Sequence, residues 1–219
     1  MNGLPVLLLL ILTAALPVIL LFFWYHRVRC PLSTGLFLLF LLGGATSMFI
    51  ALILQALIPP LPGLSGGLGQ TAFNLFCRIA ATEETSRLLV FLILFPLARI
   101  RGENSLLRGR AAGLAAGLGF ALVESAAYGA SDAGIALLRT VTSAPLHGAC
   151  GARVGEAAVG FREGFFPSLL RFLSAVAIHG AYNFMIRSSG VIGVMAVLAA
   201  FCALASSILS IRAGLKNGL

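Results

Sequence analysis

Long apolar segments dominate this chain, and short polar breaks separate them. A membrane-spanning helix needs about 20 mostly apolar residues. Seven segments approach or exceed that length: Leu4–Tyr25, Leu32–Ile58, Leu68–Ala98, Ala111–Gly129, Ile135–Phe161, Ser168–Arg187 and Val191–Ile211. Polar residues from Asn74 to Arg78 indicate that the long third segment is tilted or broken there. The runs are too long and continuous for the alternating pattern of a membrane β-barrel, so they predict an all-α polytopic transmembrane bundle of about seven helices.

Composition supports a membrane protein. The 219 residues are 59% hydrophobic and 10% charged, whereas soluble domains average about half apolar and a quarter charged. One soluble core cannot hide this much apolar surface, so the bilayer must be part of the solvent. We therefore expect residues 1–219 to form a single transmembrane domain, with its catalytic core over 70–187. We expect it to be a multi-pass protein of the cell (plasma or inner) membrane.

Basic residues predict the orientation of the bundle. The net charge is +8, and the basic residues lie mostly at segment ends rather than in runs with interleaved aromatic residues. This distribution disfavours nucleic acid as a partner. Loops on one side carry Arg27, Arg29, Arg99, Arg101, Arg108, Arg110, Arg162, Arg212 and Lys216. The positive-inside rule then predicts that the N-terminus is outside and the C-terminus is in the cytoplasm.

A small-residue pattern predicts close helix contact in the fourth segment. Gly109, Gly113 and Gly117 recur at i, i+4 and i+8, on one helix face. Glycines at this spacing let two backbones approach closely within a membrane. The pattern is a packing signal and says nothing about function.

Ionisable residues inside the third segment are the first candidate chemistry. Such a residue costs roughly 2.5–3.5 kcal/mol at the centre of a spanning helix, so it marks a functional site by default. Glu83 and Arg87 are at i, i+4 and are expected to pair on one face. Glu84 lies about 100° further round and is expected to be free for another task.

Each of the next three segments carries at least one polar residue that could join this chemistry. Glu124 lies in the fourth, His147 in the fifth, and His179 with Asn183 at i, i+4 in the sixth. With a rise of 1.5 Å per residue, Glu84, Glu124 and the two histidines all fall roughly 10–25 Å below the outer surface. This common depth predicts that they share one layer and one cavity.

Two chemistries fit such a cavity. In the first, the imidazoles and one carboxylate bind Zn²⁺ and leave a position open for water. The ion lowers the pKa of that water to about 7, and a second Glu acts as general base. In the second, no metal is needed. A desolvated Glu takes a proton from water while His and Asn stabilise the oxyanion.

Structural explanations compete with both chemistries. Glu83 and Arg87 form a plausible ion pair that carries both charges into the membrane, and a single membrane histidine is commonly a helix-to-helix hydrogen-bonder. We expect Arg78, Arg139 and Arg153 to snorkel or cap polar cavities. Glu156 and Glu163 are expected near the cytoplasmic edge, where solvation is easy. The alternative function is a non-catalytic scaffold or binding protein, or a small transporter, although no internal repeat supports a transporter.

The order of the motifs resembles one protein family. E-E-x-x-R, G-F-x-x-x-E, an isolated His and H-x-x-x-N follow one another on successive segments, as in the PrsW family of intramembrane metalloproteases. Gly117 to Ser125 and His179 to Phe184 carry the closest likeness, and the match covers Thr82 to Phe184, nearly half of the chain. That family belongs with the CAAX-processing Abi proteases and the membrane scaffold subunit of gamma-secretase.

The resemblance implies roles in the third segment. Glu83 and Glu84 match the paired glutamates, one of which is the water-activating base. Arg87 matches the basic residue that closes the motif. That residue is often Lys in relatives, so Arg is a mild departure.

It also implies roles for the later residues. Glu124 matches the Glu of the family at a position where the CAAX branch has His. His147 and His179 match the two later histidines. Asn183 occupies a position that relatives fill with Asn or Asp.

These observations combine into one hypothesis about function. We expect an intramembrane endopeptidase that cleaves a membrane protein or membrane-anchored peptide, which the resemblance suggests is an anti-sigma factor. The expected metal is Zn²⁺ on His147, His179 and Glu124, with Glu83 or Glu84 as base; the metal-free mechanism stays open. Arg87, Glu124 and Asn183 complete the predicted catalytic set. The sequence makes no prediction of oligomeric state.

Overall fold

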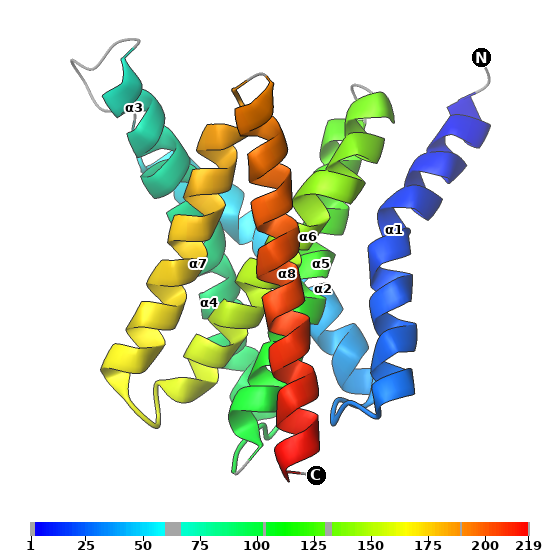
Figure 1. Ribbon diagram of the computed structural model, residues 1–219, viewed down its shortest axis with the longest axis vertical. Helices are drawn as coiled ribbons and strands as arrows, with labels where there is room; N and C mark the ends of the chain where they lie inside the picture. The colour runs from blue at the N-terminus through cyan, green and yellow to red at the C-terminus, as the bar shows by residue number, and fades with distance from the viewer. Residues whose placement is uncertain (1–2, 60–66, 103, 130–132, 189, 219) are drawn as a thin grey trace.

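The chain folds into a bundle of long helices that run between the same two ends of the molecule (Figure 1). The structure is a computed structural model that describes residues 3–59, 67–102, 104–129, 133–188 and 190–218. Over these ranges the chain forms seven continuous helices and no strand. They are α1 Gly3–Val28, α2 Thr34–Leu57, the unbroken run of α3 Leu68–Phe73, η1 Asn74–Ala80 and α4 Ala81–Leu97, α5 Ser105–Gly129, α6 Ala133–Gly160, α7 Phe165–Met185 and α8 Val191–Gly218. This confirms the predicted all-α bundle.

The irregularity expected in the third segment is a stretch of π-helix. Residues Asn74–Ala80 form this stretch, and α4 continues from it without a break. Short π-helical insertions often occur at functional sites. The Arg78 guanidinium donates from Nε to the carbonyl of Ile58 (2.7 Å) and from Nη2 to that of Gln55 (3.4 Å). It therefore caps the end of α2, one turn before the glutamates of α4.

The helix α5 begins earlier than its hydropathy predicts. It starts at Ser105, six residues before the expected Ala111. Arg110, which we expected in a loop, is therefore part of the helix. Its guanidinium donates to Glu156 of α6 at 2.6 Å. Glu156 is only 8% exposed and also pairs with Arg171 of α7. The expectation that Glu156 sits at a solvated edge was therefore wrong, because two arginines replace the water.

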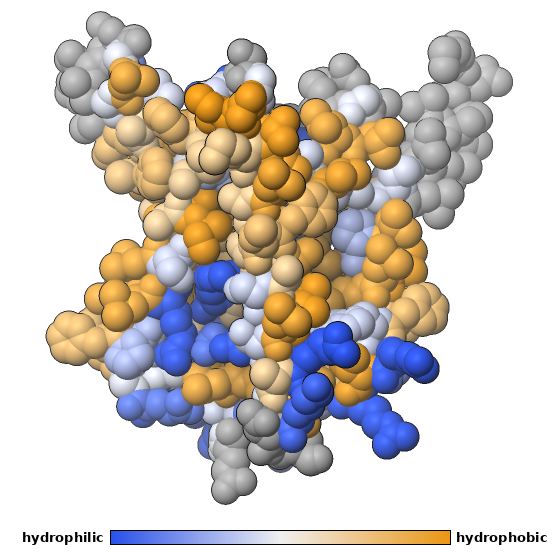
Figure 2. All heavy atoms as spheres, viewed as in Figure 1, coloured by the Kyte–Doolittle hydropathy of each residue, from blue (hydrophilic) through white to orange (hydrophobic). Residues whose placement is uncertain are grey.

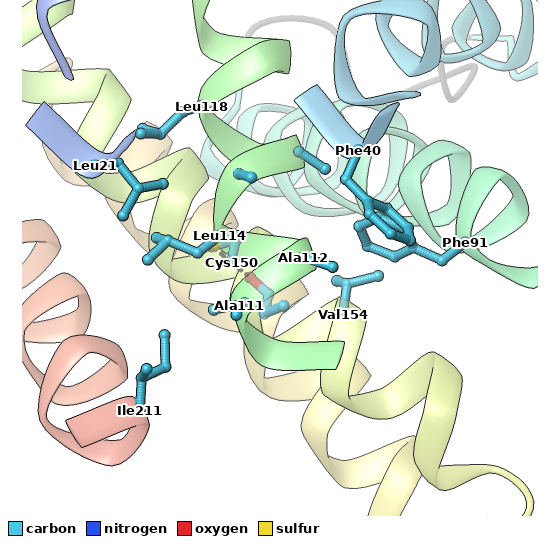
Figure 3. Packing of buried hydrophobic residues seen from close by; sticks show 14 of the residues in the cluster. Leu21, Phe40, Phe91, Ala111, Ala112, Leu114, Leu118, Cys150, Val154 and Ile211 are labelled. Carbon is cyan, nitrogen blue, oxygen red and sulfur yellow. Dashed lines mark hydrogen bonds between the residues drawn. The ribbon is translucent and has the colours of Figure 1, made fainter. Parts of the chain in front are cut away.

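A glycine seam joins α5 to α6 and confirms the predicted close contact. A Cβ on Gly113 would overlap the backbone of α6 at Gly151, and one on Gly117 would overlap the carbonyl of His147. Residues 111–121 of α5 are all buried. Figure 3 shows Ala111, Ala112 and Leu114 of α5 in this core, with the ring of Phe40 of α2 beside that of Phe91 of α4 at a tilt of 57°. Side chains on α5 and α6 next to the seam are consequently held in place by backbone contact.

The outer surface is strongly apolar. Phe23, Leu42, Ile93 and Leu198 are each more than half exposed, and apolar residues cover most of the face in Figure 2. Such a surface suits lipid rather than water. Among the described helices, α2, α5 and α8 are long and apolar enough to cross a membrane on length and composition alone. The termini lie at opposite ends (Figure 1), but which end faces outside stays a prediction.

Candidate active site

Four helices bring ionisable side chains into one buried cluster. Glu83, Glu84 and Arg87 come from α4, Glu124 from α5, His147 from α6 and His179 from α7. Glu84 and Arg87 have no exposed surface, and Glu124, the most accessible of the six, is 8% exposed. The imidazole centroids of His147 and His179 are 5.0 Å apart. The residues expected to share one cavity therefore lie together.

Arg87 is the hub of the cluster. Its Nη1 donates to Glu84 Oε2 at 2.8 Å, and its Nη2 donates to His147 Nδ1 at 3.2 Å. The guanidinium carbon lies 4.5 Å from the centre of the Phe120 ring, a favourable cation–π distance. The closest carboxylate is thus Glu84, whereas the expected partner Glu83 is 3.9 Å away. Glu84 is not free, because residues three and four apart on a helix are both within reach of an arginine.

Hydrogen bonding determines the tautomer of His147. A guanidinium can only donate, so His147 Nδ1 accepts and Nε2 carries the proton. Nε2 then donates to Glu124 Oε2 at 2.7 Å. Arg139 Nη2 reaches the same oxygen at 2.5 Å. Arg139, expected to snorkel or cap a cavity, therefore anchors the carboxylate that orients His147.

His179 and Glu83 each have one polar atom that makes no hydrogen bond within the cluster. His179 Nδ1 lies 2.7 Å from Glu84 Oε1, so that carboxylate accepts the imidazole proton. His179 Nε2 is then left 3.6 Å from Glu83 Oε2. That oxygen is buried and has no hydrogen-bond partner among the described residues. A lone pair on nitrogen and a carboxylate oxygen without a hydrogen-bond partner therefore face one another, a costly arrangement unless a proton, a water or a cation lies between them.

Gln55 of α2 is a member of the site that we did not predict. Its side-chain amide donates to Glu83 Oε1 at 3.4 Å. The available signal was an amide near the end of an otherwise apolar helix, where polar side chains are expensive unless they find a partner. The pattern of the second segment did not indicate which helix it would face.

Asn183 lies beside the cluster without joining its hydrogen bonds. It is one turn beyond His179 on α7 and is partly buried. Among the described residues its side chain has no hydrogen-bond partner. Its amide is therefore available to a ligand that enters from the His179 side.

The donor set fits a divalent metal ion. One ligand atom each from Glu83, His147 and His179 lie within 4.8 Å of one another. Histidine nitrogen with a carboxylate is a typical zinc donor set. The expected carboxylate was Glu124, which instead contacts His147 Nε2 in the manner of a carboxylate that orients a metal-binding imidazole.

The charges of the cluster also suit a cation. Three glutamates (Glu83, Glu84 and Glu124) face two arginines (Arg87 and Arg139), which leaves one negative charge when both imidazoles are neutral. An unbalanced negative charge is costly at a buried site, and a bound cation supplies charge of the opposite sign. To use Nδ1 as a ligand, His147 would have to give up its hydrogen bond from Arg87.

Comparison with known protein families finds one match. Residues 31–207 match the family described as PrsW family intramembrane metalloprotease. This range includes every member of the cluster and Gln55. Comparisons with curated proteins and with solved structures each gave no match. Because the match spans most of the chain and includes its buried Glu/His cluster, the chain belongs to the PrsW family of intramembrane metalloproteases.

Proposed function

We propose that the chain hydrolyses a peptide bond of a membrane protein or membrane-anchored peptide at this cluster, with Zn²⁺ held by Glu83, His147 and His179. The observation that supports the proposal is the unpaired Glu83 Oε2, buried 3.6 Å from His179 Nε2. Nitrogen donors favour zinc over magnesium or calcium. The protein would work as a single multi-pass domain of the cell membrane.

Each carboxylate then has a distinct role. Glu84 orients His179 through Nδ1, and Glu124 orients His147 through Nε2. Glu83 is the carboxylate left to hold the metal, next to the reacting water. Bound zinc would supply a water of pKa about 7 and a Lewis acid for the scissile carbonyl.

The arginines and Asn183 complete the proposed site. Arg87 and Arg139 hold Glu84 and Glu124 in place and offset their charge. The free amide of Asn183, on the same face as His179, would donate to the oxyanion that forms on the substrate carbonyl. Preorganised donors of this kind cost no rearrangement when charge develops.

The test is metal analysis combined with cleavage of a transmembrane reporter by the full-length protein in detergent. We expect about one zinc per chain in the wild type, in line with three protein ligands and a fourth position open to water. His147→Ala and His179→Ala should lose it, whereas Arg212→Gln, a surface change, should retain it. Glu84→Gln and His179→Ala should each abolish cleavage without loss of the folded state.

Three outcomes would overturn the proposal in different ways. If both histidine variants retain zinc, His147 and His179 are not the metal ligands. If the wild type is active without zinc and Glu83→Gln is inactive, the mechanism would be metal-free, with Glu83 taking the proton directly from water. Folded, zinc-loaded protein that cleaves no membrane substrate would indicate a scaffold.

A further inference from the structure

We propose that the groove between α7 and α8 binds one anionic phospholipid, with an acyl chain in its apolar part and the phosphate beside Arg153 and Arg171. This site is separate from the Glu/His cluster and does not depend on the proposed hydrolysis. Three features support it: an apolar cavity, an excess of cations next to it, and their order along the helix axes.

The apolar part is a cavity of about 340 Å³. Ligand pockets typically have volumes of about 300–1,000 Å³. Leu146 of α6 forms its floor, Ile178 and Met185 line it from α7, and Ala199 and Ala203 line it from α8. The small alanines on α8 leave the space that a flexible hydrocarbon chain would fill.

The polar part lies about two turns further along the same three helices, towards the C-terminal end of α8. Arg153 lies seven residues beyond Leu146 on α6, and its guanidinium donates to the hydroxyls of Ser206 and Ser207 on α8 (3.2 Å each). Arg171 lies seven residues before Ile178 on α7. Figure 2 shows hydrophilic residues at the surface between α7 and α8 in the lower half of the molecule.

This end of the groove carries excess positive charge. Glu156 is the carboxylate partner of both Arg110 and Arg171, at 2.6 and 3.0 Å. Arg153 has no carboxylate partner within the described ranges. Arg153 lies three residues before Glu156 on α6, so the three arginines and one glutamate of this end of the bundle sum to a charge of +2. The two arginines that share Glu156 are partly shielded from water. An anion would relieve this imbalance.

Depth favours a phospholipid as the source of that anion. Arg153 is seven residues from the end of α6, and Arg171 is six from the start of α7. At 1.5 Å per residue both lie roughly 10 Å inside the helix ends, just below a headgroup layer about 5–8 Å deep, and their long side chains can reach that layer. Basic pockets between transmembrane helices bind anionic headgroups. The apolar cavity lies further in, where the acyl chain of the same lipid would be.

A second groove serves as an internal comparison. It has a volume of about 370 Å³ and lies between α1, α6 and α8, with Trp24, Pro145 and Leu204 among its lining residues. None of its described lining residues is charged. It can accommodate hydrocarbon but offers nothing to a headgroup, so it should not distinguish anionic from zwitterionic lipid.

The test is native mass spectrometry of the full-length protein in detergent with equimolar phosphatidylglycerol and phosphatidylcholine. We expect the wild type to retain one phosphatidylglycerol in preference. Arg153→Gln and Arg171→Gln should each lower that preference roughly five-fold, the contribution of one basic residue near an anionic headgroup. Ala199→Phe, which fills the apolar part, should lower retention of the lipid. Arg212→Gln and Ala205→Phe are matched controls on other faces of α8 and should behave as wild type.

An excess of inorganic phosphate separates a lipid site from a simple anion site. We expect phosphate to leave the bound phosphatidylglycerol in place, because it cannot replace the acyl contact. The proposal fails if the wild type retains both lipids equally, or if Arg153→Gln and Arg171→Gln retain phosphatidylglycerol as well as Arg212→Gln does. It also fails if phosphate displaces the lipid or if Ala199→Phe has no effect. The thermal midpoint of each variant shows that any loss is not due to unfolding.

Discussion

The glycine seam and the Glu/His cluster use the same two helices in opposite ways. In the seam, α5 and α6 touch backbone to backbone at Gly113 and Gly117. In the cluster, Glu124 and His147 project from these helices into a buried polar network. The carbonyl of His147 packs against Gly117 while its imidazole contacts Glu124. Rigid backbone contact therefore positions a side chain whose burial is itself costly.

The difference between the two regions separates stability from chemistry. Close packing tolerates no added atoms, so changes in the seam should act on folding. A buried carboxylate oxygen without a hydrogen-bond partner costs free energy, so neutralising Glu83 in the cluster should leave folding intact or improve it. The following substitutions test this separation, from the largest expected effect to the smallest.

Gly113→Val should have the largest effect, because its side chain would overlap the α6 backbone at Gly151. Overpacking typically costs about 1–3 kcal/mol, and a backbone clash should exceed that range. We expect little or no monodisperse protein on size-exclusion chromatography. Gly35→Ala is the matched control, since nothing lies within 4 Å of its added Cβ. Wild-type yield and thermal midpoint for Gly113→Val would show that the seam does not hold the bundle together.

Glu83→Gln should remove activity without removing the fold. Loss of a proton-transfer or ligand carboxylate typically reduces rate by about 10²–10⁴-fold. The thermal midpoint should stay or rise, because a buried unpaired carboxylate oxygen becomes a neutral amide. Reporter cleavage and thermal unfolding are measured on the same sample, with Glu163→Gln near the end of the bundle as control. A large drop in the thermal midpoint of Glu83→Gln would mean that the cluster, like the seam, is needed for folding.

Arg139→Gln should have an intermediate effect. The residue contacts Glu124, which in turn orients His147. Loss of such supporting interactions typically lowers metal affinity or activity about 10- to 100-fold. Zinc affinity, measured by competition with a chelator, should fall in parallel with cleavage, and Arg139→Lys should restore part of both. Arg101→Gln is an exposed control of equal charge change. An unchanged zinc affinity would confine Arg139 to a structural role.

Gln55→Leu should have the smallest effect. The amide donates a long hydrogen bond of 3.4 Å to Glu83, and a bond of this kind contributes about 0.5–1.5 kcal/mol, or roughly a two- to ten-fold change in rate. The cleavage rate should decrease by roughly two- to ten-fold, and the thermal midpoint should not change. Thr46→Val, elsewhere on α2, should leave the rate unchanged. Complete inactivity of Gln55→Leu would instead place the amide in direct contact with the substrate or the water.

Local sequence patterns determined the architecture. Apolar runs of spanning length predicted the seven helices, because each helix satisfies its own backbone hydrogen bonds and needs no information from its neighbours. The spacing of Gly109, Gly113 and Gly117 predicted a close helix contact, since helical periodicity places these residues on one face. A constant rise per residue also put the glutamates and histidines at a similar depth.

Only the tertiary structure decided which polar groups meet. Arg87 could reach either glutamate of α4, and in the folded protein it donates to Glu84 and to His147 of α6. In the structure, Glu83 rather than Glu84 has an oxygen without a hydrogen-bond partner, and Gln55 contacts it. Arg110, which we expected in a loop, contacts Glu156 from within α5. Periodicity specifies the face of one helix, but the choice among partners depends on how helices distant in sequence are rotated against each other and on side-chain reach.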